Sequence, residues 1–183
     1  MKVVDIFSSF QGEGYYTGVR ATFIRLGGCN LNCYFCDTDW SIWKEFNITE
    51  IIKLVEDKLV VITGGEPLLQ DLDDLVLELK KDDHIIAIET NGTIEPSKIV
   101  KENCYITVSP KGNWIIREAD EVKVVNTGKI NLKDYDCIKA NRWIVHPVDI
   151  EGYFNYKDTV NLVKKGEEKW MLGIQLHKAY SIL

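Results

Sequence analysis

Long apolar runs are missing from this sequence of 183 residues. No stretch approaches the roughly 20 apolar residues that cross a bilayer, and residues 1–5 lack the apolar segment of a secretory signal peptide. Basic residues are also too few for a surface that coats nucleic acid, because the net charge is −6. We therefore expect a cytoplasmic protein that binds neither a membrane nor nucleic acid.

Cysteine is sparse and unevenly spread. The chain has five cysteines, an odd number, and three of them fall within residues 29–36. This is not the pattern of a disulfide framework. Cys104 and Cys137 stand alone, and burial statistics favour a structural role for both.

The three clustered cysteines are Cys29, Cys33 and Cys36, spaced Cys-x3-Cys-x2-Cys, and no fourth cysteine or histidine follows at ligand distance. A structural zinc site takes four ligands in a closed tetrahedron, so this loop does not suit one. Three thiolates suit a cubane iron–sulfur cluster that keeps one iron open. The alternative is three cysteines packed as small hydrophobic residues, which gives no reason for their crowding in one loop. The spacing therefore predicts a reactive iron–sulfur site.

Short apolar segments alternate with amphipathic or polar segments along the chain. Strands are predicted at residues 3–7, 21–26, 59–63, 85–89, 105–109, 121–125, 142–146 and 171–177, and helices at 47–58, 68–81, 95–102 and 156–165. This alternation is typical of parallel sheet with crossovers, and about six parallel strands are too few for a closed barrel of eight. We expect one α/β domain over residues 1–183, a partial, open TIM-like barrel with ligands at the carboxyl ends of its strands.

The strand that follows the cysteine loop ends at Gly64-Gly65-Glu66-Pro67. Glycines let a ligand approach the backbone closely, and the carbonyls and carboxylate can accept hydrogen bonds from an ammonium group. The same residues also suit a strand-to-helix turn with Pro67 at the first helical position, and both roles can hold together. Combined with the cysteine loop, this turn resembles the radical S-adenosylmethionine (SAM) superfamily. In that superfamily three thiolates hold a [4Fe–4S] cluster and SAM chelates the open iron.

Further motifs narrow the resemblance to one family within the superfamily. They are Phe10-Gln11-Gly12-Glu13-Gly14, Phe23-Ile24-Arg25-Leu26-Gly27-Gly28-Cys29, Cys36-Asp37-Thr38, Glu89-Thr90-Asn91-Gly92, Ser109-Pro110-Lys111 and Gln175-Leu176-His177-Lys178. In this order they resemble the 7-carboxy-7-deazaguanine synthases over nearly the whole chain. The resemblance implies a lyase of 7-deazapurine (queuosine or archaeosine) biosynthesis, which contracts the ring of 6-carboxy-5,6,7,8-tetrahydropterin and releases ammonia. It also implies a homodimer and an electron donor of flavodoxin or ferredoxin type.

The resemblance assigns residues to SAM and to the substrate. Those expected at SAM are Phe35, Cys36, Asp37, Gly65, Glu66, Ser109, Pro110 and Lys111. Those expected at the pterin are Phe10, Gln11, Gly12, Glu13, Arg25, Thr63, His177 and Leu183. Arg25 can clamp the substrate carboxylate or form a salt bridge at a strand end. Gln11 and Glu13 can hydrogen-bond the pterin edge or lie in a solvated loop, and a lone histidine near a terminus is otherwise more often structural.

Thr38 is assigned to a metal by resemblance alone. The family implies that its hydroxyl helps to hold a Mg²⁺ that also meets the substrate carboxylate. Hard cations prefer oxygen ligands, and without the resemblance Asp37 or Asp39 would be the more obvious ligand while Thr38 would be a turn residue.

The implied chemistry separates this family from two other classes. Reduction of SAM by the cluster gives a deoxyadenosyl radical that takes hydrogen from C6 of the pterin, and the hydrogen returns after Mg²⁺-assisted ring contraction, so SAM acts as a cofactor. A glycyl-radical activating enzyme shares the cysteine motif but acts on a partner protein, and Gln11, Glu13 and Thr38 argue against it. A non-enzymatic iron–sulfur or zinc protein is the other alternative, which metal content would distinguish.

Overall fold

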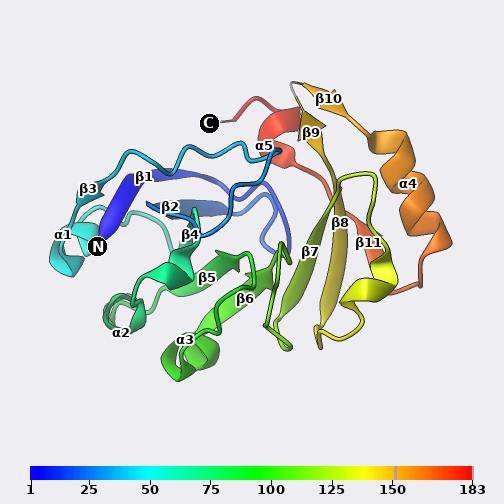
Figure 1. The fold of residues 1–183 in the computed structure, drawn as a ribbon. Coiled ribbons are helices and arrows are strands. Elements are labelled where there is room, and N and C mark those ends of the chain that lie inside the picture. The colour runs from blue at the N-terminus through cyan, green and yellow to red at the C-terminus, as the bar shows by residue number, and fades with distance from the viewer. Residues whose placement is uncertain (151, 183) are drawn as a thin grey trace.

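A computed structural model describes residues 1–150 and 152–182 of the chain. Within these ranges the main sheet has nine strands in the order β11-β8-β7-β6-β5-β4-β2-β1-β3, and it curves like an arch in Figure 1. The strands are β1 (Lys2–Phe10), β2 (Arg20–Leu26), β3 (Lys44–Glu45), β4 (Leu59–Gly64), β5 (Ile85–Thr90), β6 (Cys104–Val108), β7 (Glu121–Asn126), β8 (Arg142–Pro147) and β11 (Trp170–Leu172). Its edge strands are not paired with each other, so the barrel is open, as predicted.

The sheet is parallel except at one edge. Each neighbouring pair from β2 to β11 is parallel, which gives seven such strands in the described part of the chain, where the sequence predicts about six. Strand β1 instead runs antiparallel to β2 as far as the pair Phe10↔Arg20. The strand predicted at residues 3–7 therefore extends to residue 10. Strand β3 pairs with β1, and β9 (Asp149–Ile150) and β10 (Tyr153–Phe154) form a separate ribbon.

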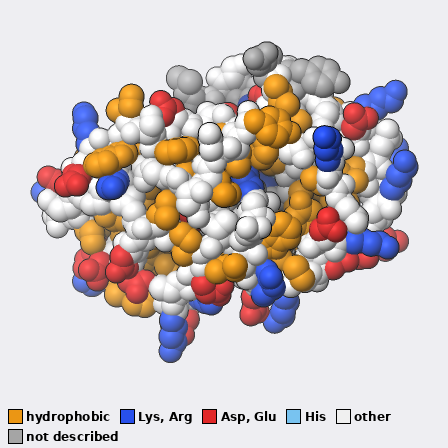
Figure 2. All heavy atoms as spheres, in the orientation of Figure 1, with side chains coloured by type: hydrophobic (Ala, Val, Ile, Leu, Met, Phe, Trp, Pro, Cys, Tyr) orange, Lys and Arg blue, Asp and Glu red, His pale blue; other side chains and the backbone are white. Residues whose placement is uncertain are grey.

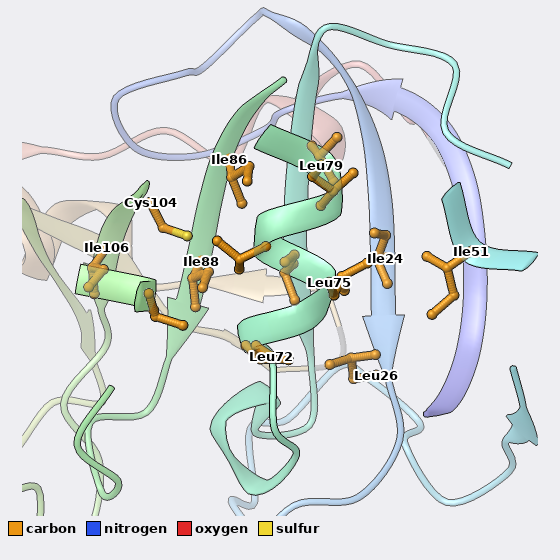
Figure 3. Close-up of a cluster of buried hydrophobic side chains, with 14 of the residues drawn as sticks. Ile24, Leu26, Ile51, Leu72, Leu75, Leu79, Ile86, Ile88, Cys104 and Ile106 are labelled. Carbon is orange, nitrogen blue, oxygen red and sulfur yellow. The ribbon is translucent and has the colours of Figure 1, made fainter. Parts of the chain in front are cut away.

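Helices α1 (Ile48–Ile52), α2 (Asp73–Lys81), α3 (Lys98–Asn103) and α4 (Tyr156–Lys165) cover the outer side of the arch, together with the 3₁₀ turns η1 (Pro67–Leu69) and η2 (Leu132–Tyr135). The short helix α5 (Leu176–Ala179) instead lies against the loop after β1, where the Leu176 N–H donates to the Gly12 carbonyl. In Figure 3, α2 lays Leu75 and Leu79 over side chains of β2 and β5 such as Ile88. Each of these three residues is fully buried, and burial of one such side chain contributes about 1.5–3 kcal/mol. This layer fixes the strands whose ends carry the site.

Three helices differ from the sequence prediction for local reasons. Helix α3 begins at Lys98 and not at residue 95, because the Ser97 side chain caps its first turn. Helix α1 begins with a capping box between Asn47 and Glu50, but it ends at Ile52 and not at residue 58. The backbone N–H groups of Glu56 and Asp57 donate to the Thr22 hydroxyl at 3.1 and 3.0 Å, which draws the chain out of the helix. The helix predicted at 68–81 is split into η1 and α2 because Gln70 exchanges side-chain hydrogen bonds with the backbone of β1.

The other differences lie in the second half of the chain. Residues 171–177 are strand only as far as Leu172, after which Gly173 donates to the Val145 carbonyl and the chain turns into α5. Helix α4 begins and ends where the sequence predicts. Cys104 is buried, whereas Cys137 is exposed. The burial expected for Cys137 is wrong, because its neighbour Ile138 takes the inward position after η2.

The surface carries charge around its margins. Figure 2 shows Lys, Arg, Asp and Glu side chains spread around the rim of one face, with hydrophobic side chains gathered toward its middle. Among the residues described, no helix is both long enough and apolar enough to cross a membrane.

Candidate active site

A pocket of about 300 Å³ lies where the parallel strands end. It is built from loops that follow successive strands, from β7, and from the segment after β11. The residues that the sequence assigned to ligands and that line this pocket are Phe10, Gln11, Gly12, Glu13, Arg25, Cys29, Cys33, Phe35, Cys36, Asp37, Thr38, Thr63, Gly65, Ser109, Lys111 and His177. Glu66 and Pro110 are not part of the lining, and Leu183 lies outside the described residues.

The cysteine loop, residues 28–38, follows β2 directly. Its turn is closed by a hydrogen bond from the Cys36 N–H to the Cys33 carbonyl at 3.0 Å. All three thiols are free and none is fully buried. Burial raises the pKa of the Cys33 thiol, nearby Lys111 partly offsets this rise, and Cys36 and Cys29 add to it. The three sulfur atoms are therefore near neighbours at the mouth of one pocket.

This donor set fits an iron–sulfur cluster. Within residues 1–150 and 152–182, no three His, Cys, Asp or Glu side chains converge as the ligands of a single metal ion do. A cubane makes a different demand, since each cysteine thiolate binds its own iron atom. Three free thiols on one short loop beside a pocket meet that demand and leave one iron without a protein ligand.

The glycine turn after β4 packs directly against the cysteine loop. A Cβ at Gly65 would lie 2.0 Å from the Gly28 carbonyl oxygen, and the Glu66 N–H donates to that same oxygen at 2.9 Å. Gly64 has φ +131°, and a Cβ at this position would lie 2.1 Å from the Leu26 carbonyl oxygen. The glycines are thus required by contact between two segments of this chain, in addition to any approach of a ligand.

Glu66 has a different place from the one predicted. Its side chain is fully buried, and its carboxylate accepts hydrogen bonds from the Leu68 N–H, the Thr90 hydroxyl and the Asn91 N–H at 3.0, 2.8 and 2.7 Å. Burial raises the pKa of Glu66, and these hydrogen bonds counteract the rise. Because it joins the ends of β4 and β5 without lining the pocket, Glu66 supports the pocket wall from behind.

The remaining residues assigned to SAM are held by their neighbours. Ser109 is buried and its N–H donates to the Thr90 carbonyl at 2.7 Å. Asp37 forms an ion pair with Lys178 at 2.9 Å, and the same ammonium meets Asp149 at 3.0 Å. The segment after β11 is therefore tied to the residue that follows the last cysteine.

A buried charged group lies on the opposite side of the pocket. We call Glu13, Glu89 and Lys123 the Lys123 cluster: the Lys123 ammonium is 2.7 Å from the Glu13 carboxylate and 3.3 Å from that of Glu89. The Gln11 amide donates to Glu89 at 3.1 Å, and the Gln175 amide donates to Glu13 at 2.7 Å. Gln11 and Glu13 are thus ordered in a network, and they do not lie in a solvated loop.

The Lys123 cluster is strongly coupled electrostatically. Burial alone would raise the pKa of Glu13, but the charges of Lys123 and His146 and the hydrogen bonds from Lys123 and Gln175 bring it far below its usual range. Burial would lower the pKa of Lys123, and the two carboxylates raise it instead. Glu13 and Lys123 are therefore both charged at neutral pH.

Arg25 forms a cation–π contact with a stacked pair of aromatic rings. Its guanidinium lies 5.2 Å from the centre of the Phe7 ring, and Phe7 stacks on Phe23, its antiparallel partner, with 5.2 Å between ring centres. Within the part of the chain that the structure describes, Arg25 has no ion pair, so the strand-end salt bridge does not occur there. Thr63, the partner of Arg25 on the neighbouring strand β4, also lines the pocket, and its hydroxyl donates to Glu89 at 3.4 Å.

His177 closes over the loop that follows β1. A Cβ at Gly12 would lie 2.1 Å from His177 Nδ1, and the Leu176 N–H donates to the Gly12 carbonyl at 2.8 Å. Thr38 lies in the same pocket at the end of the cysteine loop, and its carbonyl is 3.5 Å from Cys36 Sγ.

Comparison with known proteins places this geometry in a family. The Radical SAM superfamily model matches residues 23–112. The 7-carboxy-7-deazaguanine synthase of Haemophilus influenzae is 33% identical, over 98% of this chain and 93% of that protein. The enzyme of the same name from Bacteroides thetaiotaomicron is 38% identical, over 99% and 98%. The chain belongs to the 7-carboxy-7-deazaguanine synthase family. The crystal structure of QueE from Escherichia coli agrees in fold, with a TM-score of 0.77 and 26% identity over 96% of this chain and 94% of that one.

Sequence reasoning on this member of the 7-carboxy-7-deazaguanine synthase family left several residues of the pocket unassigned, among them Glu89, Lys123 and Lys178. Glu89 and Lys178 belong to motifs that carried the resemblance, but neither was assigned to the site. Lys123 belongs to none of the motifs. Its signal was a single lysine between Val122 and Val124 in an apolar strand, because lysine is almost never buried unless it is paired.

Proposed function

We propose that this chain is a radical SAM lyase that converts 6-carboxy-5,6,7,8-tetrahydropterin into 7-carboxy-7-deazaguanine with loss of ammonia, in 7-deazapurine biosynthesis. The observation that carries the proposal is the meeting of nearly all the family motifs, from residue 10 to residue 178, around one pocket. Similarity to 7-carboxy-7-deazaguanine synthases over the full length of the chain supports it. No observation favours a glycyl-radical activating enzyme.

The cysteine loop would hold a [4Fe–4S] cluster through Cys29, Cys33 and Cys36. With SAM on the open iron, the cluster supplies a deoxyadenosyl radical for hydrogen abstraction. We assign the SAM side of the pocket to Phe35, Asp37, Gly65, Ser109 and Lys111, all of which line it. Glu66 and Pro110 act from behind the lining, and Glu66 does so by fixing the ends of β4 and β5.

The substrate side is assigned to the residues that surround the Lys123 cluster. Arg25 offers an unpaired guanidinium, in the described part of the chain, for the pterin carboxylate. Gln11, Glu13 and Thr63 offer amide, carboxylate and hydroxyl groups for the pterin edge, with Phe10, Gly12 and His177 closing over it. Burial of these groups away from water strengthens each such hydrogen bond.

Finer features of the function follow from the family resemblance. We assign a Mg²⁺ to Thr38, because its oxygen lies in the pocket near the cysteine loop and hard cations take oxygen ligands. We also infer a homodimer, a cytoplasmic location and an electron donor of flavodoxin or ferredoxin type. Omission of Mg²⁺ from the assay tests the metal assignment, and gel filtration tests the homodimer.

Anaerobic reconstitution with iron and sulfide tests the proposed activity. With SAM, reductant and Mg²⁺, the protein should form 7-carboxy-7-deazaguanine from the carboxypterin. Cys33→Ala should lose cluster and activity together, whereas Cys137→Ala, at an exposed cysteine that is not part of the pocket lining, should keep both. Failure of the wild-type protein to form the deazaguanine, or turnover by Cys33→Ala, would refute the proposal.

A further inference from the structure

We propose that Lys123 is a positioning residue for substrate recognition: it sets the spacing and charge of Glu13 and Glu89, so that these carboxylates meet the N–H donor edge of the substrate. The inference rests on the proposed function for the identity of the substrate. Neither the family motifs nor the pattern of the cysteine loop includes Lys123.

Lys123 joins three parts of the fold through one buried ammonium group. It lies on β7, Glu89 lies on β5, and Glu13 lies in the loop after β1. Both ion pairs use the one ammonium, and its side chain is only 8% exposed. A buried ammonium with two partners fixes their separation more tightly than the loop after β1 could, because that loop has no sheet partner of its own.

The hydrogen bonds of the two carboxylates leave acceptor capacity for a ligand, because each carboxylate has about four lone-pair sites. Glu13 uses one oxygen for Lys123 and the other for Gln175. In Glu89, one oxygen faces Lys123 and Gln11, while the other has only the long 3.4 Å contact from Thr63 among the described residues. Two carboxylates and one ammonium leave a net charge of −1 in the Lys123 cluster. An amide N–H and an amino group, such as a pterin carries, would form charge-assisted hydrogen bonds there.

The charged state of the Glu13 carboxylate depends on Lys123. The titratable groups that interact with Lys123 are Glu13 from the loop after β1, Glu89 from β5, His146 from β8 and Glu121 on β7 itself. His177 from α5 interacts in turn with His146. Without the ammonium, burial would favour protonation of the Glu13 carboxylate. A protonated carboxyl is a poorer acceptor, so substrate affinity would then fall as the pH is lowered.

Lys123→Met tests this role in the reconstituted enzyme, because methionine fills a similar volume without charge. We expect KM for the carboxypterin to rise by about tenfold or more, since one partner of a buried charge pair is lost. The kcat should change less, the SAM-dependent spectrum of the cluster should be retained, and the acid limb of kcat/KM should move to higher pH. Lys139→Met is the matched control, because it breaks an exposed lysine–glutamate pair. A wild-type KM and a wild-type pH profile in Lys123→Met would overturn the proposal.

Thermal melting gives a readout that does not depend on turnover. In the wild type the lowered pKa of Glu13 stabilises the fold above the ordinary carboxyl pKa, and this contribution is lost as the pH falls. In Lys123→Met the unpaired carboxylates should instead cost stability as the pH rises. The Tm difference between the two proteins should therefore grow between about pH 4.5 and pH 8. A constant difference would overturn the charge role, even if the wild type proved inactive on the pterin.

The double variant Glu13→Gln/Lys123→Met covers the case in which Lys123→Met does not fold. It removes one charge of each sign, so its Tm at neutral pH should be higher than that of Lys123→Met. It should still bind the pterin more weakly than the wild type, in equilibrium binding to the unreduced holoenzyme. Wild-type affinity in the double variant would overturn the proposal.

Discussion

The two sides of the pocket are built in different ways. On the cysteine side, one loop of consecutive residues carries the three thiols, and backbone hydrogen bonds and glycine contacts hold it against the turn after β4. On the Lys123 side, side chains far apart in sequence are joined by charge: Glu13 is 110 residues from Lys123 and 162 from Gln175. The first side is a local motif, whereas the second exists only when β1, β5, β7 and the C-terminal segment are in place.

This difference has a functional consequence. Partly exposed thiols on a loop suit a site that must receive a preformed inorganic cluster and an electron. A buried, charge-balanced network suits recognition of a polar substrate, because the alignment of its acceptors is fixed before the substrate arrives. Substitutions on the cysteine side should therefore reduce cofactor content, and substitutions on the Lys123 side should change KM and pH dependence.

The largest effect is expected from Gly65→Ala. The new Cβ would lie 2.0 Å from the Gly28 carbonyl, so the cysteine loop would have to move, at a cost of about 3 kcal/mol in free energy of unfolding. Iron content after reconstitution should fall with it. Gly128→Ala is the control: it has φ +86° but nothing within 4 Å of the added atom, and should cost about 1 kcal/mol. Normal iron content and stability in Gly65→Ala would show that the two segments are not in tight contact.

Glu66→Gln should destabilise the protein by about 2 kcal/mol, because an amide N–H₂ would face the backbone N–H of Asn91 or of Leu68. The pKa of the buried Glu66 is raised, so its protonated form favours the fold and this contribution is lost as the pH rises through the folded-state pKa. The stability advantage of the wild type over Glu66→Gln should therefore shrink from about pH 5 upward. Urea unfolding at several pH values measures this trend, and Glu118→Gln on the surface serves as the control. An advantage that grows with pH would contradict the assigned environment.

Much of the cysteine side could be predicted from the sequence because its determinants are contiguous. The spacing of Cys29, Cys33 and Cys36 and the strand that precedes them are visible in a short window. The sequence could not show that Glu66 turns inward, since the three donors that surround it come from η1 and from the end of β5. A motif gives the residue type, but it does not show whether the side chain faces the pocket or the protein interior.

The other side of the pocket was predictable only in part. Gln11 and Glu13 were found through their motif, but their partner Lys123 lies in a strand whose other residues are apolar. The antiparallel pairing of β1 was missed because strand direction is set by a partner and not by residue type. The same limit applies to the end of the chain, where contacts with β8 and the loop after β1 interrupt a β-prone stretch.

Lys178→Met should give a smaller effect that links the two sides. Its ammonium bridges Asp37 beside the last cysteine and Asp149 at β9. Because Asp37 is largely exposed, the loss should be about 1 kcal/mol, seen as a roughly fivefold fall in kcat/KM with nearly normal iron content. Lys101→Met, which breaks a surface pair with Glu95, should leave kcat/KM unchanged. A complete loss of the cluster in Lys178→Met would mean that the C-terminal segment serves to hold the cysteine loop and does not link the two sides of the pocket.

The smallest effect is expected from Phe7→Leu, which removes the aromatic ring that contacts the Arg25 guanidinium. Phe7→Leu keeps an apolar side chain but removes the ring that faces the guanidinium at 5.2 Å, and a cation–π contact of this kind is worth about 0.5–1 kcal/mol. We expect KM for the carboxypterin to rise about threefold with kcat preserved, because Arg25 remains present but is less firmly held. Phe7→Tyr keeps the ring and should restore the wild-type KM. If Phe7→Leu and Phe7→Tyr raised KM equally, packing against Phe23 would account for the effect, and orientation of Arg25 would not.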